Sequence, residues 1–362
     1  MPAPLSAVDA ISPAFARTKR LLLQPFRFGF WVRLGLVVLV TGESLSGGWG
    51  GSSGFNFPFP RGSGDNGDKF LLLADPSWER ALAYIPWIIA GGIAVFALGL
   101  LWTYVSSVFR FILLDAVLND RCRLGEGWCR WQPQGFSYFL WQIVLSVAMI
   151  ASLAVLFGLP VLLAWRAGIF RQPDQHVSLL VAGGVGLFFL FIAWVVLGAL
   201  VALFAKDFVI PFMALEGLGV LAAWRRVLPL LRVEKMAYAG YVLMKIVLAV
   251  GSAVLFGIIN VILFLVVFVL LGLVGVGLFL AGKAAGLTWD AYTIGAVVVL
   301  GVAVLAGLLY LLAFVFVPAM VFFQSYTLHF LGARYPLLDS LLHPPPPAAA
   351  PAAAAPAPSP AS

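Results

Sequence analysis

Charged residues are scarce in this chain. They make up 10% of its 362 residues, whereas hydrophobic residues make up 62%. A soluble globular domain carries about 25% charged residues. The low charge therefore excludes an ordinary soluble domain and indicates that lipid is the main solvent of the protein.

Cysteine and histidine are also rare. Cys122 and Cys129 are the only cysteines, with six residues between them, and no histidine lies near enough in sequence to complete a metal site. The sequence also lacks the metalloprotease, P-loop and CxxC motifs. We therefore predict no metal, no cofactor and no catalytic residue. Both thiols are expected in a cytoplasmic loop, where they stay reduced.

One short string resembles a catalytic motif. Residues 51–54 match the G-x-S-G pattern around the serine of rhomboid-type intramembrane proteases. Such a serine needs a histidine base inside the membrane, and His176, His329 and His343 all fall outside the predicted spans. We therefore expect no serine protease here.

Long apolar runs dominate the rest of the sequence. Five of them exceed the roughly 20 residues that a helix needs to cross about 30 Å of hydrocarbon: residues 81–109, 137–165, 177–205, 241–281 and 291–323. A sixth run, residues 30–41, is short and contains Arg33. A basic cluster precedes this run and no small-x-small cleavage site follows it, which predicts an uncleaved helix and excludes a signal peptide.

A threefold pattern supports the short first span. A basic stretch rich in proline and aromatic residues leads three times into an apolar span that opens on a polar residue: Arg33, Gln142 or Lys245. Each of these spans is followed by an overlong second span with its own polar residue: Arg110, Lys206 or Gln324. We therefore predict an all-α transmembrane bundle of six spans, built as three repeated hairpins with interfacial helices.

Charge predicts the orientation. Sixteen of the 22 lysines and arginines fall on one side of this six-span arrangement, together with both termini. The positive-inside rule places that side in the cytoplasm, so we expect a multi-pass protein of the inner (cytoplasmic) membrane. The net charge of +7 then reflects topology. Nucleic-acid binding is not predicted, because the basic residues flank spans and form no single stripe.

The segment 241–281 leaves the span count open. As one helix it would be about twice as long as the hydrocarbon is thick, and a turn near Gly257–Asn260 would create a seventh span. We favour six spans, with the helix ending or kinking near Gly272–Gly277. The predicted domains are a basic N-terminal segment (1–29), the membrane domain (30–343, with a flexible outer loop at 42–75) and a disordered Pro/Ala-rich tail (344–362).

Ionisable residues near the span ends are the candidate site, because ionisable groups within membrane spans are costly to bury and are functional by default. Arg33, Arg110, Lys206 and Lys245 recur at equivalent positions of the repeat, and Asp115, Asp207 and Glu216 are their candidate counter-ions. Pointing inward, they would form a polar layer for an anion or a lipid headgroup. The alternative, which we favour, is that they reach the interface and only fix depth. Arg225 beside Trp224 resembles an interfacial anchor.

A stretch after the fourth span carries a family resemblance. Its pattern combines Pro211, Glu216, Gly219, Ala223 and Arg225 behind Phe208. It resembles uncharacterised prokaryotic polytopic membrane proteins and, distantly, the membrane domain attached to some glycerophosphodiester phosphodiesterases. The soluble phosphodiesterase domain of those enzymes has no counterpart in this sequence, so the resemblance implies the bundle and no catalysis.

The sequence thus favours a non-enzymatic membrane protein. We expect a scaffold, lipid-contacting or envelope-related accessory factor whose partners are anionic lipid headgroups. The alternative is a small transporter or channel for an anionic solute that uses the cationic residues on the cytoplasmic side. A membrane-protein partner and a homo-oligomer both stay open.

Overall fold

The structure is a computed structural model that describes residues 6–42, 78–169, 176–284, 286 and 290–342, and it leaves the side chains of 78–84 and 291 undescribed. Within these ranges the regular elements are helices, with no strand. The prediction of an all-α protein is therefore confirmed. Residues 43–75 of the predicted loop at 42–75, and the tail at 344–362, lie outside the described residues.

Five helical segments are long and apolar enough to cross a membrane. They are α4 (Trp78–Asn119), α5 (Leu124–Arg166), α6 (Val177–Phe204) with its continuation to Glu216, α9 (Lys235–Ala284) and α10 (Ala291–Gly332). All five are longer than the roughly 20 residues that cross the hydrocarbon. The second helix of each predicted hairpin continues to residue 119, 216 or 332, as the sequence predicts. The aromatic and basic stretch around Trp128 belongs to the first turns of α5.

The predicted first span is a bent pair of short helices. Helix α1 (Ile11–Leu23) and helix α2 (Phe28–Thr41) meet at a bend of 120°. Trp31 on α2 donates an Nε1–H bond of 2.9 Å to the carbonyl of Leu22, which fixes this bend. The 14 residues of α2 rise only about 21 Å. A sixth span therefore exists only if the bent pair is counted as one span.

Helix α9 answers the question of a seventh span. It runs through 50 residues without a break, past Gly257–Asn260 and past Gly272, Gly275 and Gly277. The side-chain amide of Asn260 donates 2.9 Å to the carbonyl of Phe256 one turn back, so it is used inside the helix and not in a turn. The seven-span alternative is wrong, and so is the helix end predicted at the glycines.

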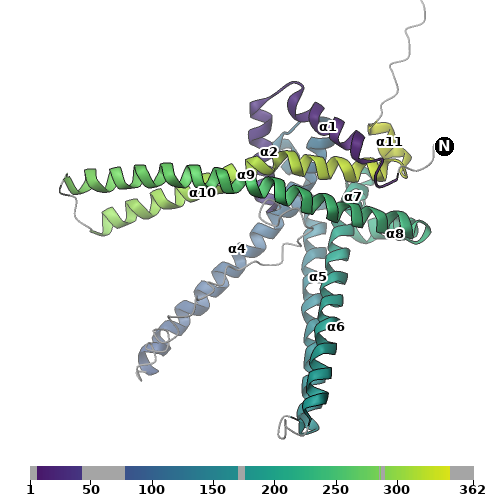
Figure 1. Ribbon diagram of the computed structural model, residues 1–362, viewed down its shortest axis with the longest axis horizontal. Coiled ribbons are helices and arrows are strands. Elements are labelled where there is room, and N and C mark those ends of the chain that lie inside the picture. The colour runs from purple at the N-terminus through teal and green to yellow at the C-terminus, as the bar shows by residue number, and fades with distance from the viewer. Residues whose placement is uncertain (1–5, 43–77, 170–175, 285, 287–289, 343–362) are drawn as a thin grey trace, which may run out of the picture.

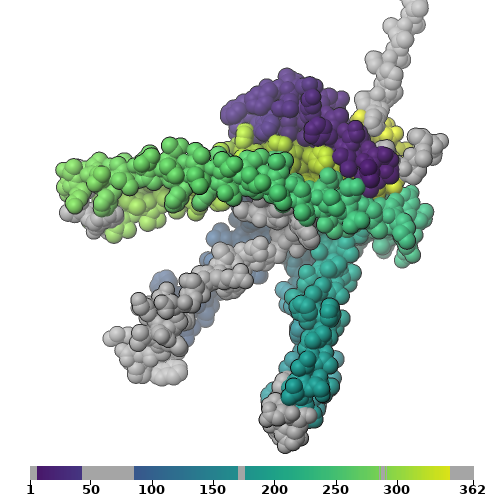
Figure 2. Space-filling view, in the orientation of Figure 1, coloured from purple at the N-terminus to yellow at the C-terminus, as the bar shows by residue number. Residues whose placement is uncertain are grey.

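The long helices leave a common hub and extend as three arms (Figure 1). One arm is α4, the second pairs α5 with α6, and the third pairs α9 with α10; the space-filling view shows them well separated (Figure 2). Phe157 and Phe191 join α5 to α6 at a ring-centroid distance of 5.8 Å, and Phe256 and Phe316 join α9 to α10 at 5.6 Å.

The hub holds the main hydrophobic core. It joins α1, α2 and the inner ends of the long helices to three short elements: α7 (Ile210–Glu216), α8 (Val220–Val233) and α11 (Pro336–Leu342). Its largest fully buried side chains include Tyr138, Phe111, Phe208, Tyr241 and Phe330. Side-chain packing thus concentrates where the arms meet. The apolar windows of the five spans have only 0 to 6% of their residues buried.

Candidate functional site

A buried polar cluster joins three segments of the hub that are far apart in sequence. Asp207 and Lys245 form an ion pair, with 4% and 6% of their side chains exposed. Tyr241, one turn before Lys245 on α9, donates a hydrogen bond of 2.9 Å to the Asp207 carboxylate. The same hydroxyl lies 2.7 Å from Oγ1 of Thr327 on α10. The cluster therefore ties the end of the α6 segment to α9 and α10.

A short π-helical turn brings Asp207 into this cluster. The turn, η3 (Ala205–Val209), lies between α6 and α7, just before Pro211. Proline lacks the N–H that an α-helix needs and its ring clashes with the preceding turn. A local π-helical adjustment is one way in which a membrane helix accommodates a proline. Within η3 the side chain of Asp207 is buried and that of Lys206 is half-buried. The sequence pattern selected Lys206 as the repeat residue, and the residue that pairs with Lys245 is its neighbour Asp207.

Aromatic rings pack around Tyr241, which donates its hydrogen bond to the ion pair. Tyr241 stacks on Tyr326 with centroids 5.3 Å apart and planes 7° apart, and it contacts Phe330 at 4.6 Å. Phe208 packs against Tyr241 at 5.1 Å from the side of the π-turn. Burial removes water from Asp207 and Lys245, so the charges depend on one another and on the hydroxyl groups for stabilisation.

Two further carboxylates of the hub bind residues of the segment that follows α10. Arg334, two residues after the end of α10, donates 2.7 Å to Glu234, the residue between α8 and α9. Tyr335 donates 2.7 Å to Glu216 at the end of α7. Burial and the bond to Glu216 raise the pKa of Tyr335 to about 12. Glu216 also lies 3.6 Å from the Arg226 guanidinium.

Arg110 is buried at the crossing of α4 and α5. Its guanidinium donates 3.2 Å to the Tyr138 hydroxyl and lies 5.8 Å from the centre of that ring. One turn away, Ser107 donates 2.8 Å to the side-chain oxygen of Gln142, the predicted repeat residue of the second hairpin. The polar residues of α4 and α5 thus meet at one crossing.

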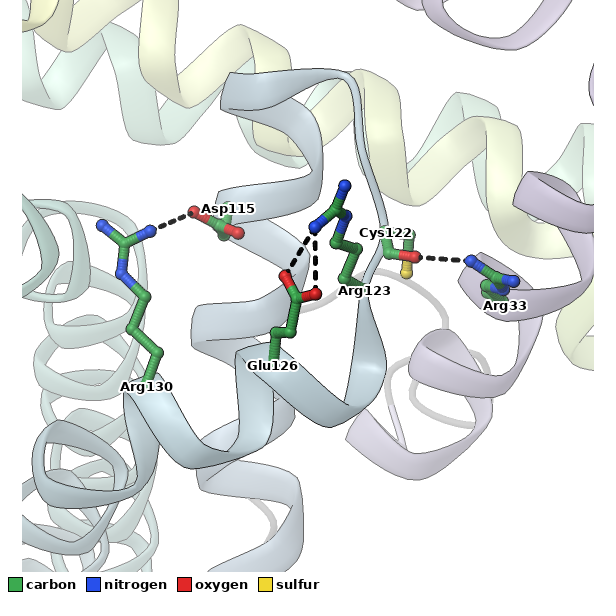
Figure 3. Close-up of polar contacts among 6 residues, drawn as sticks. All are labelled: Arg33, Asp115, Cys122, Arg123, Glu126 and Arg130. Carbon is green, nitrogen blue, oxygen red and sulfur yellow. Dashed lines mark hydrogen bonds and ion pairs between the residues drawn. The ribbon is translucent and has the colours of Figure 1, made fainter.

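The connection between α4 and α5 is held by arginines (Figure 3). Arg33 on α2 donates 3.1 Å to the carbonyl of Cys122, and Arg123 forms a bond pair of 2.9 Å with Glu126. Arg17 on α1 donates to the carbonyls of Val117 and Leu118 at 2.9 and 3.1 Å. These carbonyls belong to the last turn of α4, where cations are favourable.

The eight candidate residues therefore lie in different places. Arg110, Asp207 and Lys245 are buried, whereas Lys206, Asp115 and Glu216 are half-buried, and Arg33 and Arg225 are exposed. Of the proposed counter-ions, Asp207 pairs with Lys245. Asp115 instead lies 3.9 Å from Arg130, and Glu216 lies beside Arg226.

Sequence reasoning missed several residues of these contacts: Arg17, Tyr138, Tyr241, Thr327 and Arg334. The tyrosines had a detectable signal, because Tyr138 and Tyr241 both stand four residues before a repeat residue, Gln142 or Lys245. Residues four apart share a helix face. Arg17 and Arg334 lie outside the predicted spans and had no such signal.

Metal chemistry has no candidate site in the described part of the chain, where no three His, Cys, Asp or Glu side chains gather closely enough to hold an ion. The G-x-S-G string at residues 51–54 lies outside the described residues.

Fold and contacts together define a class of protein: an all-helical protein with five or six segments suited to cross a membrane and a hub with a buried ion pair. The chain belongs to the family of unknown function DUF7544, whose model matches residues 5–341. No curated protein and no solved structure matches the chain.

Proposed function

We propose that this protein is a non-enzymatic, lipid-contacting scaffold of the inner membrane. The observation that carries the proposal is the exposure of the apolar windows, of which at most 6% is buried within the chain. Helices that enclose a solute pathway bury much of their surface against one another. The apolar surface of these three arms is instead exposed, where lipid can contact it. The hub provides the rigid part of such a scaffold, because its core and its buried polar contacts connect all three arms.

The charges of the hub support an orientation for this scaffold. Its surface exposes eleven cations: Lys19, Arg20, Arg27, Arg33, Arg121, Arg123, Arg130, Arg225, Arg226, Arg232 and Lys235. Among the described residues of the hub, four carboxylate side chains are exposed, namely Asp9, Asp120, Glu126 and Asp339. A surface of this charge suits anionic lipid headgroups at the cytoplasmic face. Both described ends of the chain lie in the hub. Tyr326 donates 3.0 Å to the carbonyl of Ala7, and Leu338 and Leu342 of α11 belong to the core.

The three predicted hairpins contact one another in the hub. Each second helix of a predicted hairpin contacts the opening helix of the next: α4 meets α5 through Arg110 and Tyr138, and η3 meets α9 through Asp207 and Tyr241. The third such contact closes the circle, because Tyr310 on α10 donates 2.8 Å to the carbonyl of Val32 on α2. We propose that the three hairpins are equivalent units arranged in a ring. This arrangement explains why the polar residues of each hairpin lie at the hub.

An anion transporter is less well supported by these contacts. Asp207 occupies the place beside Lys245 where a solute anion would bind, so the cation is already neutralised. Efflux and uptake of inorganic phosphate, chloride and small carboxylates in proteoliposomes test this. We expect rates equal to those of protein-free liposomes. Saturable transport that Lys245→Ala abolishes and Lys283→Ala leaves intact would replace the scaffold with a transporter.

A further inference from the structure

Helix α8 and the first turn of α9 carry an exposed face that mixes cations with large apolar side chains. Leu221, Val233 and Met236 are 72%, 83% and 87% exposed. Exposed Arg225, Arg226, Arg232 and Lys235 lie between and beside them in the sequence. Apolar exposure in the arms is explained by lipid, but these residues belong to the hub.

The opposite face of α8 is buried in the hub. Val220, Ala223 and Val227 recur every three or four residues along the helix and join the hydrophobic core. Trp224 lies beside them and contacts Trp141 of α5 at a centroid distance of 6.1 Å. These contacts fix the orientation of α8 about its own axis. The side that faces outward is the one that carries the basic and large apolar residues.

The acidic residues at both ends of α8 have contacts of their own. Glu216 binds Tyr335 and lies near Arg226, and Glu234 binds Arg334. The side chains of Arg225, Arg232 and Lys235 are exposed. The face thus presents net positive charge.

The connection to α9 fixes where this face lies. Only one residue, Glu234, separates α8 from α9, whose 50 residues far exceed the roughly 20 that cross a bilayer. The start of α9 therefore emerges on the hub side of the membrane, and α8 lies at the hub end of the α5–α6 arm (Figure 1). A helix with basic and apolar side chains on one exposed face at this position has the character of an interfacial helix.

We propose that the exposed face of α8 and the α9 start docks on the anionic headgroups of the same membrane that the arms cross, with Leu221, Val233 and Met236 inserted among the upper acyl chains. Arg225, Arg232 and Lys235 contact the lipid phosphates. This inference rests on the proposed function, for which it names a lipid-binding surface and its ligand, an anionic phospholipid.

Nitroxide labels on the full-length protein test the insertion. Cysteines replace Leu221, Val233 or Met236 singly, with Cys122→Ala and Cys129→Ser as the background. Labels at Ser340 and Phe268, exposed on α11 and on the α9 arm, provide the water and lipid references. In nanodiscs that contain phosphatidylglycerol, the three labels should collide with oxygen more than with a water-soluble nickel complex.

The results separate the alternatives. Labels as accessible to the nickel complex as Ser340 would overturn the docking. Protection from both reagents would show that a second copy of the chain covers this face, and it would also overturn the proposal. Equal insertion in neutral and anionic nanodiscs would refute the role of the cations.

A comparison of two cation variants tests the ligand. The variant Arg225→Gln/Arg232→Gln/Lys235→Gln should weaken phosphatidylglycerol binding, measured by native mass spectrometry, by about fivefold for each cation removed. Its control, Arg166→Gln/Lys283→Gln, removes two exposed cations at the far ends of α5 and α9 and should change binding much less for each cation removed. An equal loss for each cation in both variants would refute the α8 surface but leave the lipid-contacting scaffold. No loss in either variant would contradict anionic lipid recognition by the hub as well.

Discussion

At the residue scale, the Asp207–Lys245 pair has the largest energetic consequence. Taking two charges out of water costs several kcal/mol each, and their attraction compensates only when both are present. Tyr241 adds a hydrogen bond to the carboxylate, and Thr327 lies against the same hydroxyl. The pair therefore specifies how η3, α9 and α10 meet.

Removing one charge of the pair should destabilise the protein more than removing both. We expect Lys245→Met to destabilise the protein by about 3–5 kcal/mol, because Asp207 is left buried without its cation. The double variant Asp207→Leu/Lys245→Met should recover a large part of this loss. Thermal unfolding in one detergent measures both.

Lys283→Met is the control for this comparison, since Lys283 is exposed near the far end of the same helix. A double variant as unstable as the sum of its single variants would show that the two residues do not interact.

The two cysteines should differ in reactivity. Burial raises the pKa of the Cys122 thiol to about 11, whereas the side chain of Cys129 is exposed. At pH 8 a raised pKa keeps the Cys122 thiol protonated, and the thiolate is the form that reacts. Alkylation of the folded protein with N-ethylmaleimide should add one group, at Cys129, by mass spectrometry.

Denatured protein provides the control for this prediction, because both thiols should then react. Rapid modification of Cys122 in the folded protein would contradict the buried α4–α5 connection that Arg33 holds.

At the element scale, the crossing of α4 and α5 depends on one glycine. A Cβ atom at Gly135 would lie 2.6 Å from Val108 Cγ2 and 3.0 Å from Val108 Cα, so a backbone atom of α4 occupies that space. Gly158 lies on the same helix, but a Cβ there would meet nothing within 4 Å. A substitution at Gly135 therefore tests the close packing of α4 and α5, whereas the same substitution at Gly158 tests helix propensity alone.

We expect Gly135→Ala to lower the stability by about 1–3 kcal/mol, because α4 must shift away from α5. Gly158→Ala should be neutral or stabilising by up to about 1 kcal/mol, since alanine is the better helix former. Unfolding midpoints of both variants, measured under identical conditions, check this. A similar change at both positions would show that α4 and α5 do not cross at Gly135.

At the scale of the whole molecule, the hub and the far ends of the arms should face opposite sides of the membrane. Cysteines at Ser6 and Ser340 report on the hub, and a cysteine at Ala167 reports on the turn after α5. In sealed inverted vesicles of a Cys129→Ser background, a membrane-impermeant maleimide should modify the two hub positions and spare Ala167. Modification of Ser6 and Ser340 from opposite sides would contradict the predicted arrangement of six spans.

Much of the fold was predictable because long apolar helices have a strong local signal. The ends of α4, α6–α7 and α10 follow from the length of the apolar runs and the polar residues behind them. The uninterrupted course of α9 was harder to predict, because glycines that break helices in water are tolerated in an apolar environment. The short α2 was predicted as a span on the basis of the repeat.

The candidate site was only partly predictable. Arg110, Asp207 and Lys245 were selected from their positions at span ends, and all three are buried in the hub. The partners of Asp115 and Glu216 were not predicted from the sequence. Arg130 and Arg226 approach these two carboxylates from other helices. Arg17, which binds carbonyls a hundred residues away, depends entirely on how α1 folds back on α4.

The sequence by itself determined the solvent, the helices and the end of each span at which polar residues gather, because hydrophobicity and helical periodicity act locally along the chain. Only the tertiary structure decided which charges meet and which face outward. The π-turn before Pro211 rotates Asp207 towards Lys245, and packing in the hub turns one side of α8 outward. Such choices depend on contacts between distant segments, for which a single sequence carries little local signal.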